Sequence, residues 1–466
     1  MATLSGLGFN LSALQQDALI LAALLAPVFL LAGLLLRGIE VEGLTRALLW
    51  RYRWTNTLFA ALMALSAGLG IAVIAQERAL RHGAARAADK FDVIVTAPGD
   101  KVQALLSVVY LQPSNLPLLS GDVLARLQAD TRIDLVAPIA FGDSFDGAPI
   151  IGTTAAFVSH LAGGMLAQGR MFATTGEAVA GASVSLPIGT HFAPLHGFLG
   201  IGRHTGHSAA GEAPHVHTGS GLEIVGRLPP TGSPWDRALL VPIEAVWLTH
   251  SLGGGHSEPA AHALAGSGAS QVGAGNPKIG PPFDTDHFPG SPAFVLHSTS
   301  LAANYNAQRR YNDARSMAFF PGAVLSELYS ILGDVRETLS LMAILTKILV
   351  AVGILSGLVA LSKLFARRFA LLRAIGAPKR FVLAIVWTYA ASLIAVGCLA
   401  GIAVGWGAAS GLSSVVAAYT NIALTPAIGF SELHLVAAFF CLTSLLALIP
   451  AWIAYRRNVL DDLRQS

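Results

Sequence analysis

The segment A-R-R-F-A-L-L-R-A-I-G-A-P-K-R, from Ala366 to Arg380, indicates how the rest of the chain is organised. Six cations and no acid lie between Lys363 and Arg380, and long apolar runs flank the segment on both sides. Basic residues between two membrane-spanning helices favour the cytoplasmic face. We therefore predict a cytoplasmic segment at 363–380, which carries a short amphipathic helix with a glycine near its end and lies between two spans.

The composition is typical of an integral membrane protein. Of the 466 residues, 53% are hydrophobic and only 12% are charged, whereas soluble domains carry about 25% charged residues. The net charge of +3 gives no reason to expect a nucleic-acid partner. Cys398 and Cys441 both lie in apolar runs, which argues against a disulfide framework and against a thiolate metal site.

Five apolar stretches are long enough to cross about 30 Å of hydrocarbon at about 1.5 Å per residue. We expect spans at 18–36, 57–75, 338–362, 381–407 and 433–455. The basic residues between and after these spans lie on one side of the membrane, and this side is the cytoplasmic one only if the N-terminus is outside. The predicted outer segments are then 1–17, 76–337 and 408–432, and the predicted cytoplasmic segments are 37–56, 363–380 and 456–466.

The outer segment 76–337 is long enough for a folded α+β domain. Phe91–Thr96, Leu222–Leu228 and Ala238–Pro242 have strand-like composition, and a helix is expected at Ile243–Thr249. Proline suits a first helical position, so we expect a stalk helix at 321–337 that continues into the third span. Two tracts, 191–220 and 251–290, are rich in Gly, Ser, Pro and His and are expected to be surface loops.

Several stretches together resemble the FtsX-like and MacB-like permease family. Arg367 to Ala377 is similar to the coupling segment of that family. The outer domain carries four further stretches that resemble the family's extracytoplasmic domain: G-E-A-V-A-G at 176–181, L-P-I-G at 186–189, I-V-G-R-L-P-P-T-G at 224–232 and P-W-D-R-A-L-L-V-P at 234–242. The family has glutamates where Arg368 and Tyr389 stand here, and its common form has four spans, so the N-terminal span is an addition.

The resemblance implies an α-helical membrane protein with five spans and a large α+β extracytoplasmic domain of the MacB type, in the bacterial inner membrane. It further implies a permease subunit of a mechanotransmitting, type VII-like ABC transporter, which works with a second permease copy and a cytoplasmic ABC ATPase. The chain lacks the G-x-x-x-x-G-K-[ST] phosphate loop, so ATP and Mg would be bound by the ATPase, and this chain is not expected to be an enzyme. A periplasmic adaptor, cargo or binding protein would meet the outer domain.

The same resemblance assigns contact with the ATPase to the coupling segment. Basic residues beside a span can instead serve only as anchors near lipid headgroups. We favour coupling for the helix as a whole. The coupling residues are then Arg367, Arg368, Leu371, Leu372, Arg373, Ala374, Ile375, Gly376 and Ala377.

The histidines gather in the outer domain, where eleven of the 14 lie between His191 and His297. Imidazole is a suitable ligand for zinc, copper and nickel, and His-rich loops can act as metal traps of low specificity. Two other interpretations are a solvated loop in which histidine is merely tolerated and a pH-responsive surface. The candidate zinc ligands are His191, His196, His204, His207, His215, His217, His250, His256 and His262.

Lys347 is the only charge in the predicted third span. An intramembrane charge is a functional candidate, but at this depth a lysine can also extend to the outer interface. Two other functions are less well supported. The sequence contains no catalytic motif of a membrane enzyme, and it shows no inverted repeat of the kind found in secondary transporters. Signalling to a periplasmic partner without transport, and a zinc-linked transport system, stay open.

Overall fold

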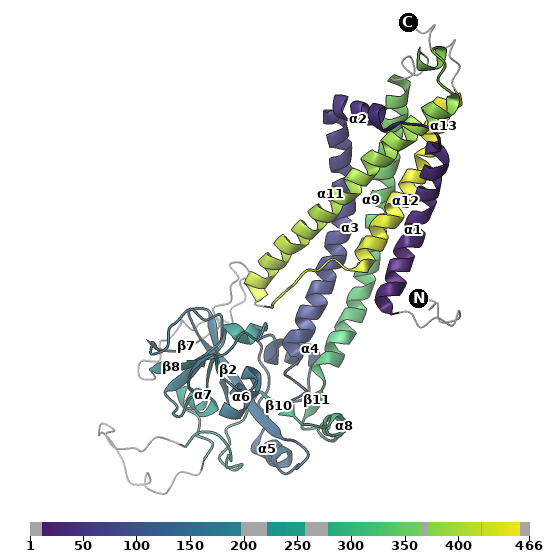
Figure 1. The fold of residues 1–466 in the computed structure, drawn as a ribbon. Coiled ribbons are helices and arrows are strands. Elements are labelled where there is room, and N and C mark those ends of the chain that lie inside the picture. The colour runs from purple at the N-terminus through teal and green to yellow at the C-terminus, as the bar shows by residue number, and fades with distance from the viewer. Residues whose placement is uncertain (1–11, 197–220, 257–277, 365–370, 421, 457–466) are drawn as a thin grey trace, which may run out of the picture. The chain divides into compact units, whose positions relative to one another are not determined.

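The computed structural model describes residues 12–196, 221–256, 278–364, 371–420 and 422–456 (Figure 1). The chain divides into two compact units. The helical unit takes in Met1–Leu80, Leu332–Val415 and Leu424–Ser466. The sheet domain takes in Arg81–Ile331 and the short segment Val416–Ala423.

In the described residues, three single helices and one pair of consecutive helices are long and apolar enough to cross a membrane. They are α1 (Ala13–Leu36), α3 (Arg53–Ala88), α11 (Lys379–Thr420) and α12 with α13 (Phe430–Leu446 and Leu448–Arg456). The predicted third span lies in α9 (Pro321–Leu364), whose described apolar stretch is Ile344–Gly357. As predicted, Pro321 is the first residue of a helix that continues past 337. The short helix α2 (Glu42–Arg51) lies in the basic segment after α1.

Small residues determine how closely α3 and α11 pack. Gly397, Gly401 and Gly405 recur every four residues on one face of α11. A β-carbon on Gly401 would lie 2.7 Å from the β-carbon of Ala67, and one on Gly405 would lie 2.7 Å from the carbonyl oxygen of Gly68. Glycine therefore permits a backbone approach that larger residues would prevent, as is common between membrane helices.

Two helix boundaries in the helical unit differ from those predicted from the sequence. The segment 408–432 is not a loop throughout, because α11 continues to Thr420. Residues 408–420 contain no proline or charge, and the next proline is Pro426, so nothing in this stretch forces the helix to end. The predicted fifth span is interrupted just before Pro450, with α12 ending at Leu446 and α13 beginning at Leu448. Proline lacks the N–H that would bond to the carbonyl of Leu446.

The sheet domain is built on a mixed sheet with eleven strands in the described residues. The order is β11-β1-β10-β2-β3-β9-β5-β8-β4, with β6 beside β8 and β7 beside β2. The pairs β3–β9 and β5–β8 are parallel and the others are antiparallel. The strands are β1 (Val93–Thr96), β2 (Leu135–Phe145), β3 (Ala148–Thr153), β4 (Gln168–Gly169), β5 (Glu177–Ala180), β6 (His191–Phe192), β7 (Leu195–His196), β8 (Leu222–Arg227), β9 (Leu239–Pro242), β10 (Ala293–His297) and β11 (Met317–Phe319).

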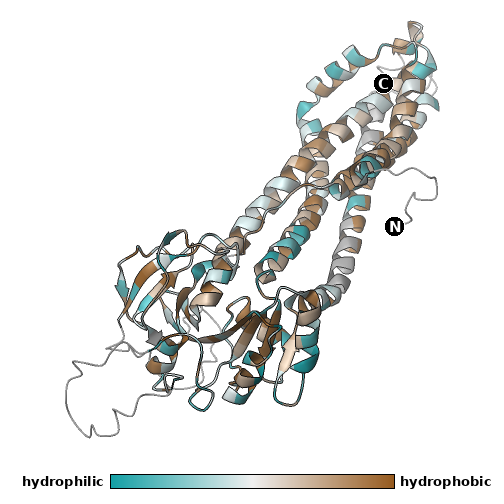
Figure 2. Ribbon diagram, turned by 60° about the horizontal axis from the view of Figure 1, so that its bottom comes forward, coloured by the Kyte–Doolittle hydropathy of each residue, from teal (hydrophilic) through white to brown (hydrophobic). Residues whose placement is uncertain are grey.

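Helices cover both faces of this sheet, so most of its strands are buried on both sides, whereas β4 is exposed. In β1, Ile94 enters one core while Val93 and Val95 enter the other, as the period of two in a strand requires. One core takes side chains from α4 (Lys101–Val108), α6 (Ala155–Ala162) and the start of α9. The second core takes them from α5 (Gly121–Gln128), α7 (Ile243–Thr249) and α8 (Leu301–Arg310). Figure 2 shows the apolar residues along the strands and along the helices of the helical unit.

The two tracts expected to be surface loops are partly built into the domain. Residues 191–196 form the strands β6 and β7. Phe283 and Phe288 are buried, and their rings lie 5.7 Å and 5.1 Å from that of Trp247. The Gly- and Pro-rich composition masked these aromatic anchors, whose burial is favourable wherever the backbone can follow. Residues 197–220 and 257–277 lie outside the described part.

Candidate functional site

The predicted coupling segment lies between α9 and α11. Its described part is a helix end that is closed by backbone hydrogen bonds. Residues 371–374 are helical. The N–H of Gly376 donates to the carbonyl of Arg373 at 3.1 Å, and the N–H of Ala377 donates to that of Leu372 at 3.0 Å. These two bonds form a Schellman motif, and Gly376 has the positive φ, 111°, that the motif requires. Pro378 follows, and α11 begins at Lys379.

The side chains of this helix end face two environments. Leu372 is half-buried and packs against the apolar core of the helical unit. Leu371 is 50% exposed and Ile375 is 86% exposed, and Arg373 is half-buried. Arg367 and Arg368 lie outside the described residues. The described part is therefore a rigid turn with one side attached to the helical unit and two large apolar side chains on its surface.

Lys347 lies on the side of α9 that packs into the helical unit. Ala351 and Ile354, one and two turns further along, are buried at 8% and 2% exposure. A β-carbon on Gly70 of α3 would lie 2.7 Å from Lys347 Nζ, so this glycine leaves the space that the ammonium occupies. The described residues offer Lys347 no carboxylate partner. A half-buried cation in this position is oriented toward the packed helices.

The nine predicted zinc ligands are not brought together within the described part of the chain. Five of them lie outside it: His204, His207, His215, His217 and His262. In the described residues, no group of three or more His, Cys, Asp or Glu side chains is arranged to hold a metal ion. His191 is exposed in β6, while residue 196 in β7 pairs with Asp143 of β2.

Two of these histidines instead pair with buried carboxylates. His250 Nε2 lies 3.5 Å from Asp143 Oδ2, and the Asp143 side chain is only 2% exposed. The hydrogen bond to this carboxylate raises the pKa of His250. His256 Nε2 lies 3.4 Å from Glu244 Oε1, which also accepts from the N–H of Gly280 at 2.6 Å. Burial raises the pKa of Glu244. The two pairs attach His250 and His256, which follow α7, to the core of the domain.

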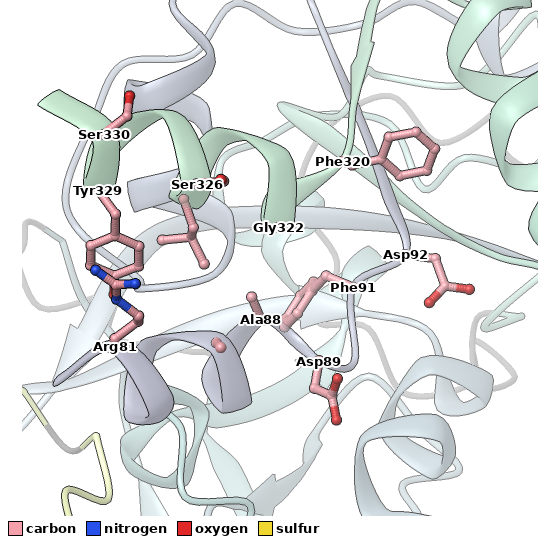
Figure 3. Close-up of a pocket in the computed structure, with 12 residues that line it drawn as sticks. Arg81, Ala88, Asp89, Phe91, Asp92, Phe320, Gly322, Ser326, Tyr329 and Ser330 are labelled. Atoms are coloured by element: carbon pink, nitrogen blue, oxygen red, sulfur yellow. The ribbon is translucent and has the colours of Figure 1, made fainter. Parts of the chain in front are cut away.

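The sheet domain has an open groove of about 770 Å³ (Figure 3). It lies between the last residues of α3 and the first three turns of α9. The guanidinium of Arg81 lies over the ring of Tyr329, 5.3 Å from its centre. Figure 3 shows this pair at one end of the groove, and Asp92 with Phe320 at the other. The wall between them is apolar and includes Ala85, Ala88, Phe91 and Leu325.

This groove and an ion pair in the helical unit were missed by the sequence analysis. The groove residues come from two segments more than 200 positions apart, and no local pattern links them. Glu432 is fully buried and pairs with Arg78 at 3.0 Å. It is the only acid between residues 338 and 460, which is a signal that could have been noticed.

A comparison of the sequence with protein-family models finds no match, and a comparison with curated proteins finds no significant match.

Proposed function

We propose that this chain is the permease subunit of an ABC transporter of the FtsX-like and MacB-like kind. In this proposal it couples ATP hydrolysis by a separate ATPase to motion of the sheet domain. The chain spans the bacterial inner membrane five times, with α9 supplying the third span, the N-terminus in the periplasm and the C-terminus in the cytoplasm. The motion drives transport or export across the envelope.

The observation that carries the proposal is the closed helix end at 371–377. Leu371 and Ile375 present large apolar surfaces beside a cluster of cations, where a soluble protein would find both an apolar and an electrostatic contact. A turn fixed by the Schellman motif transmits a push better than a flexible loop, because its two backbone bonds hold the angle between the helix end and α11. Such a turn suits force transfer.

The mechanical path in this proposal begins at the ATPase. Closure of an ATPase dimer on ATP and Mg presses on the exposed side of 371–377. Leu372 connects the turn to the apolar core of the helical unit, so the push reaches the packed helices. α3 and α9 both continue from the helical unit into the sheet domain as helices, which gives the movement two stiff connections.

The test is co-purification of an ATPase with the full chain from membranes of its native host. We expect mass spectrometry to identify an ABC-type ATPase with the wild-type protein. Ile375→Asp should abolish this association, because it places a carboxylate at the most exposed apolar position of the turn. Met165→Asp is the matched control, since Met165 is an exposed apolar residue of the sheet domain at 80% exposure.

Two results would contradict the proposal. One is the absence of any ABC-type ATPase from the wild-type preparation under conditions that retain other membrane complexes. The other is full retention of the ATPase by Ile375→Asp, which would remove the turn from the contact. Loss of the ATPase with Met165→Asp as well would show that the effect does not depend on the turn.

A further inference from the structure

Two histidines of the sheet domain, neither of them among the predicted zinc ligands, lie side by side. His160 is in the last turn of α6, and His297 is the last residue of β10. Their ring centres are 4.5 Å apart and the rings are inclined by 44°. The side chains are half-buried, so small solutes can reach them. They are 137 positions apart in sequence, so the fold and not a local motif creates the pair.

Each ring has one nitrogen engaged by an oxygen that can only accept. His160 Nε2 donates to the carbonyl of Lys90 at 3.0 Å. His297 Nδ1 donates to Asp92 Oδ2 at 2.8 Å, and the same oxygen accepts from Asn304 Nδ2 at 3.2 Å. The proton of each neutral imidazole is therefore fixed on these nitrogens. His160 Nδ1 and His297 Nε2 are left with lone pairs.

This is the arrangement that metal-binding histidines show. A ligating imidazole commonly donates its other N–H to a carboxylate or a backbone carbonyl, which orients the ring and strengthens the ligand. Here both kinds of partner are present, one for each ring.

The ring separation selects a bent geometry. Two imidazoles bound at about 2.0–2.1 Å hold their centres about 6 Å apart in a linear complex and about 5 Å apart at a tetrahedral angle. The observed 4.5 Å is shorter than both and corresponds to about a right angle at the metal, as between neighbouring ligands of a complex with more than four positions. Zinc-like divalent ions that accept imidazole, with water in the remaining positions, fit this pair.

We propose that His160 and His297 bind a divalent transition-metal ion of the zinc type, with Asp92 as a positioning residue for His297. The remaining coordination positions are filled by water, since no described group of three His, Cys, Asp or Glu side chains encloses a metal. The site does not depend on the function proposed above. It uses none of the histidines in residues 197–220 and 257–277.

The experiment titrates zinc alone into the full chain in detergent and follows binding by competition with a chromophoric chelator. The background variant carries Ala in place of His204, His207, His215, His217 and His262, so that binding by these residues is removed. We expect one site per chain in this background. His160→Ala and His297→Ala should each weaken zinc binding at least tenfold.

Asp92→Asn tests the positioning role, and it should weaken zinc binding by about 10- to 100-fold, the usual effect of removing such a partner. His82→Ala is the matched control, because His82 is an exposed histidine of the same domain that should not matter. Cobalt in place of zinc gives an electronic spectrum that reports coordination by nitrogen. Circular dichroism without metal shows that each variant is folded.

The proposal is overturned if the background variant binds no zinc, or if folded His160→Ala and His297→Ala proteins bind zinc as tightly as the background. It is also overturned if cobalt shows a water-like spectrum that neither substitution changes. An unchanged affinity in Asp92→Asn would remove Asp92 from the site.

Discussion

Arg78 Nη1 lies 3.0 Å from Glu432 Oε1 in the helical unit, and the glutamate side chain is fully buried. A second contact, from Arg78 Nη2 to Glu432 Oε2, is a hydrogen bond of 3.1 Å. The same Oε2 accepts from the N–H of Gly429 at 2.9 Å and so caps the start of α12. This glutamate therefore connects α3 to the first turn of α12 and satisfies a free backbone donor there.

We predict that Arg78→Met strongly destabilises the helical unit. The substitution leaves a buried carboxylate without its counter-charge, which costs about 3–5 kcal/mol. Thermal unfolding of the full chain in detergent measures the loss. The double variant Arg78→Met, Glu432→Leu should recover most of it, because both charges are then gone. An Arg78→Met protein as stable as wild type would show that the pair contributes nothing.

We predict that Lys347→Met raises the stability of the helical unit. The ammonium lies against Gly70 on the packed side of α9, without a described carboxylate partner. Removal of a half-buried, unpaired charge should raise the free energy of unfolding on the order of 1 kcal/mol. The exposed neighbour Thr346 supplies the control, since Thr346→Met should have little effect. A lower unfolding temperature in Lys347→Met would contradict the prediction.

ATP-driven activity of the same Lys347→Met variant separates the two interpretations of this lysine. A more stable protein that has lost activity would assign the charge to function, because stability alone cannot explain the loss. A more stable protein with full activity would support the other interpretation, in which the lysine only extends to the outer interface. The activity is measured in the reconstituted complex with the ABC-type ATPase that the proposed function requires, with Thr346→Met as the reference.

We predict that the His250–Asp143 pair makes the sheet domain less stable as the pH rises through neutrality. The pKa of His250 is raised by its hydrogen bond to Asp143. A raised pKa in the folded state contributes stability that is complete below the unfolded value, about 6.5, and is lost as the pH rises through the folded value. Amide hydrogen exchange in α7 and β2, corrected for the intrinsic rate, should show less protection at pH 8 than at pH 6.

The control for this pH effect is His250→Gln, which keeps a polar side chain but cannot titrate. The difference in protection between pH 6 and pH 8 should shrink in this variant. His287→Gln is the matched comparison, because His287 pairs with Asp284 in the exposed part of the domain. An unchanged pH difference in His250→Gln would show that another group controls it.

Local signals in the sequence were sufficient for several elements of the sheet domain. The helix Ile243–Thr249 has the predicted bounds, because Pro242 ends the preceding strand and fits poorly inside a helix. The strand at 222–227 was found because apolar residues end at Pro229 and Pro230. Pro321 marked the start of α9 in the same way. In each of these cases a proline lies at or near the beginning or the end of an element.

Small residues and long-range contacts explain what could not be predicted. The stretch 408–420 consists mostly of Ala, Ser, Gly and Val, which suit either a helix or a loop when no charge or proline decides. The groove requires residues near 81–92 and 320–330 to meet, and His160 meets His297 only through the order of the strands. Sequence periodicity carries no information on such pairs.

We predict that Gly376→Ala impairs ATP-driven activity more than it impairs folding. Gly376 has φ 111°, and a residue with a β-carbon is strained there by about 1–3 kcal/mol. No atom of the described residues lies within 4 Å of the β-carbon position, so the cost is conformational and not steric. The strain loosens the Schellman motif and therefore the connection between the exposed turn and α11.

Gly353→Ala is the matched control for Gly376→Ala. Gly353 lies in the middle of α9, its β-carbon position is also open, and its backbone is helical. Alanine is favoured over glycine in a helix by about 1 kcal/mol, so Gly353→Ala should be neutral or stabilising and keep its activity. Coupled transport in the reconstituted complex is compared with thermal unfolding for both variants. Full coupling in a Gly376→Ala protein would show that the rigidity of this turn is not what transmits force, because the substitution acts on the turn's backbone alone.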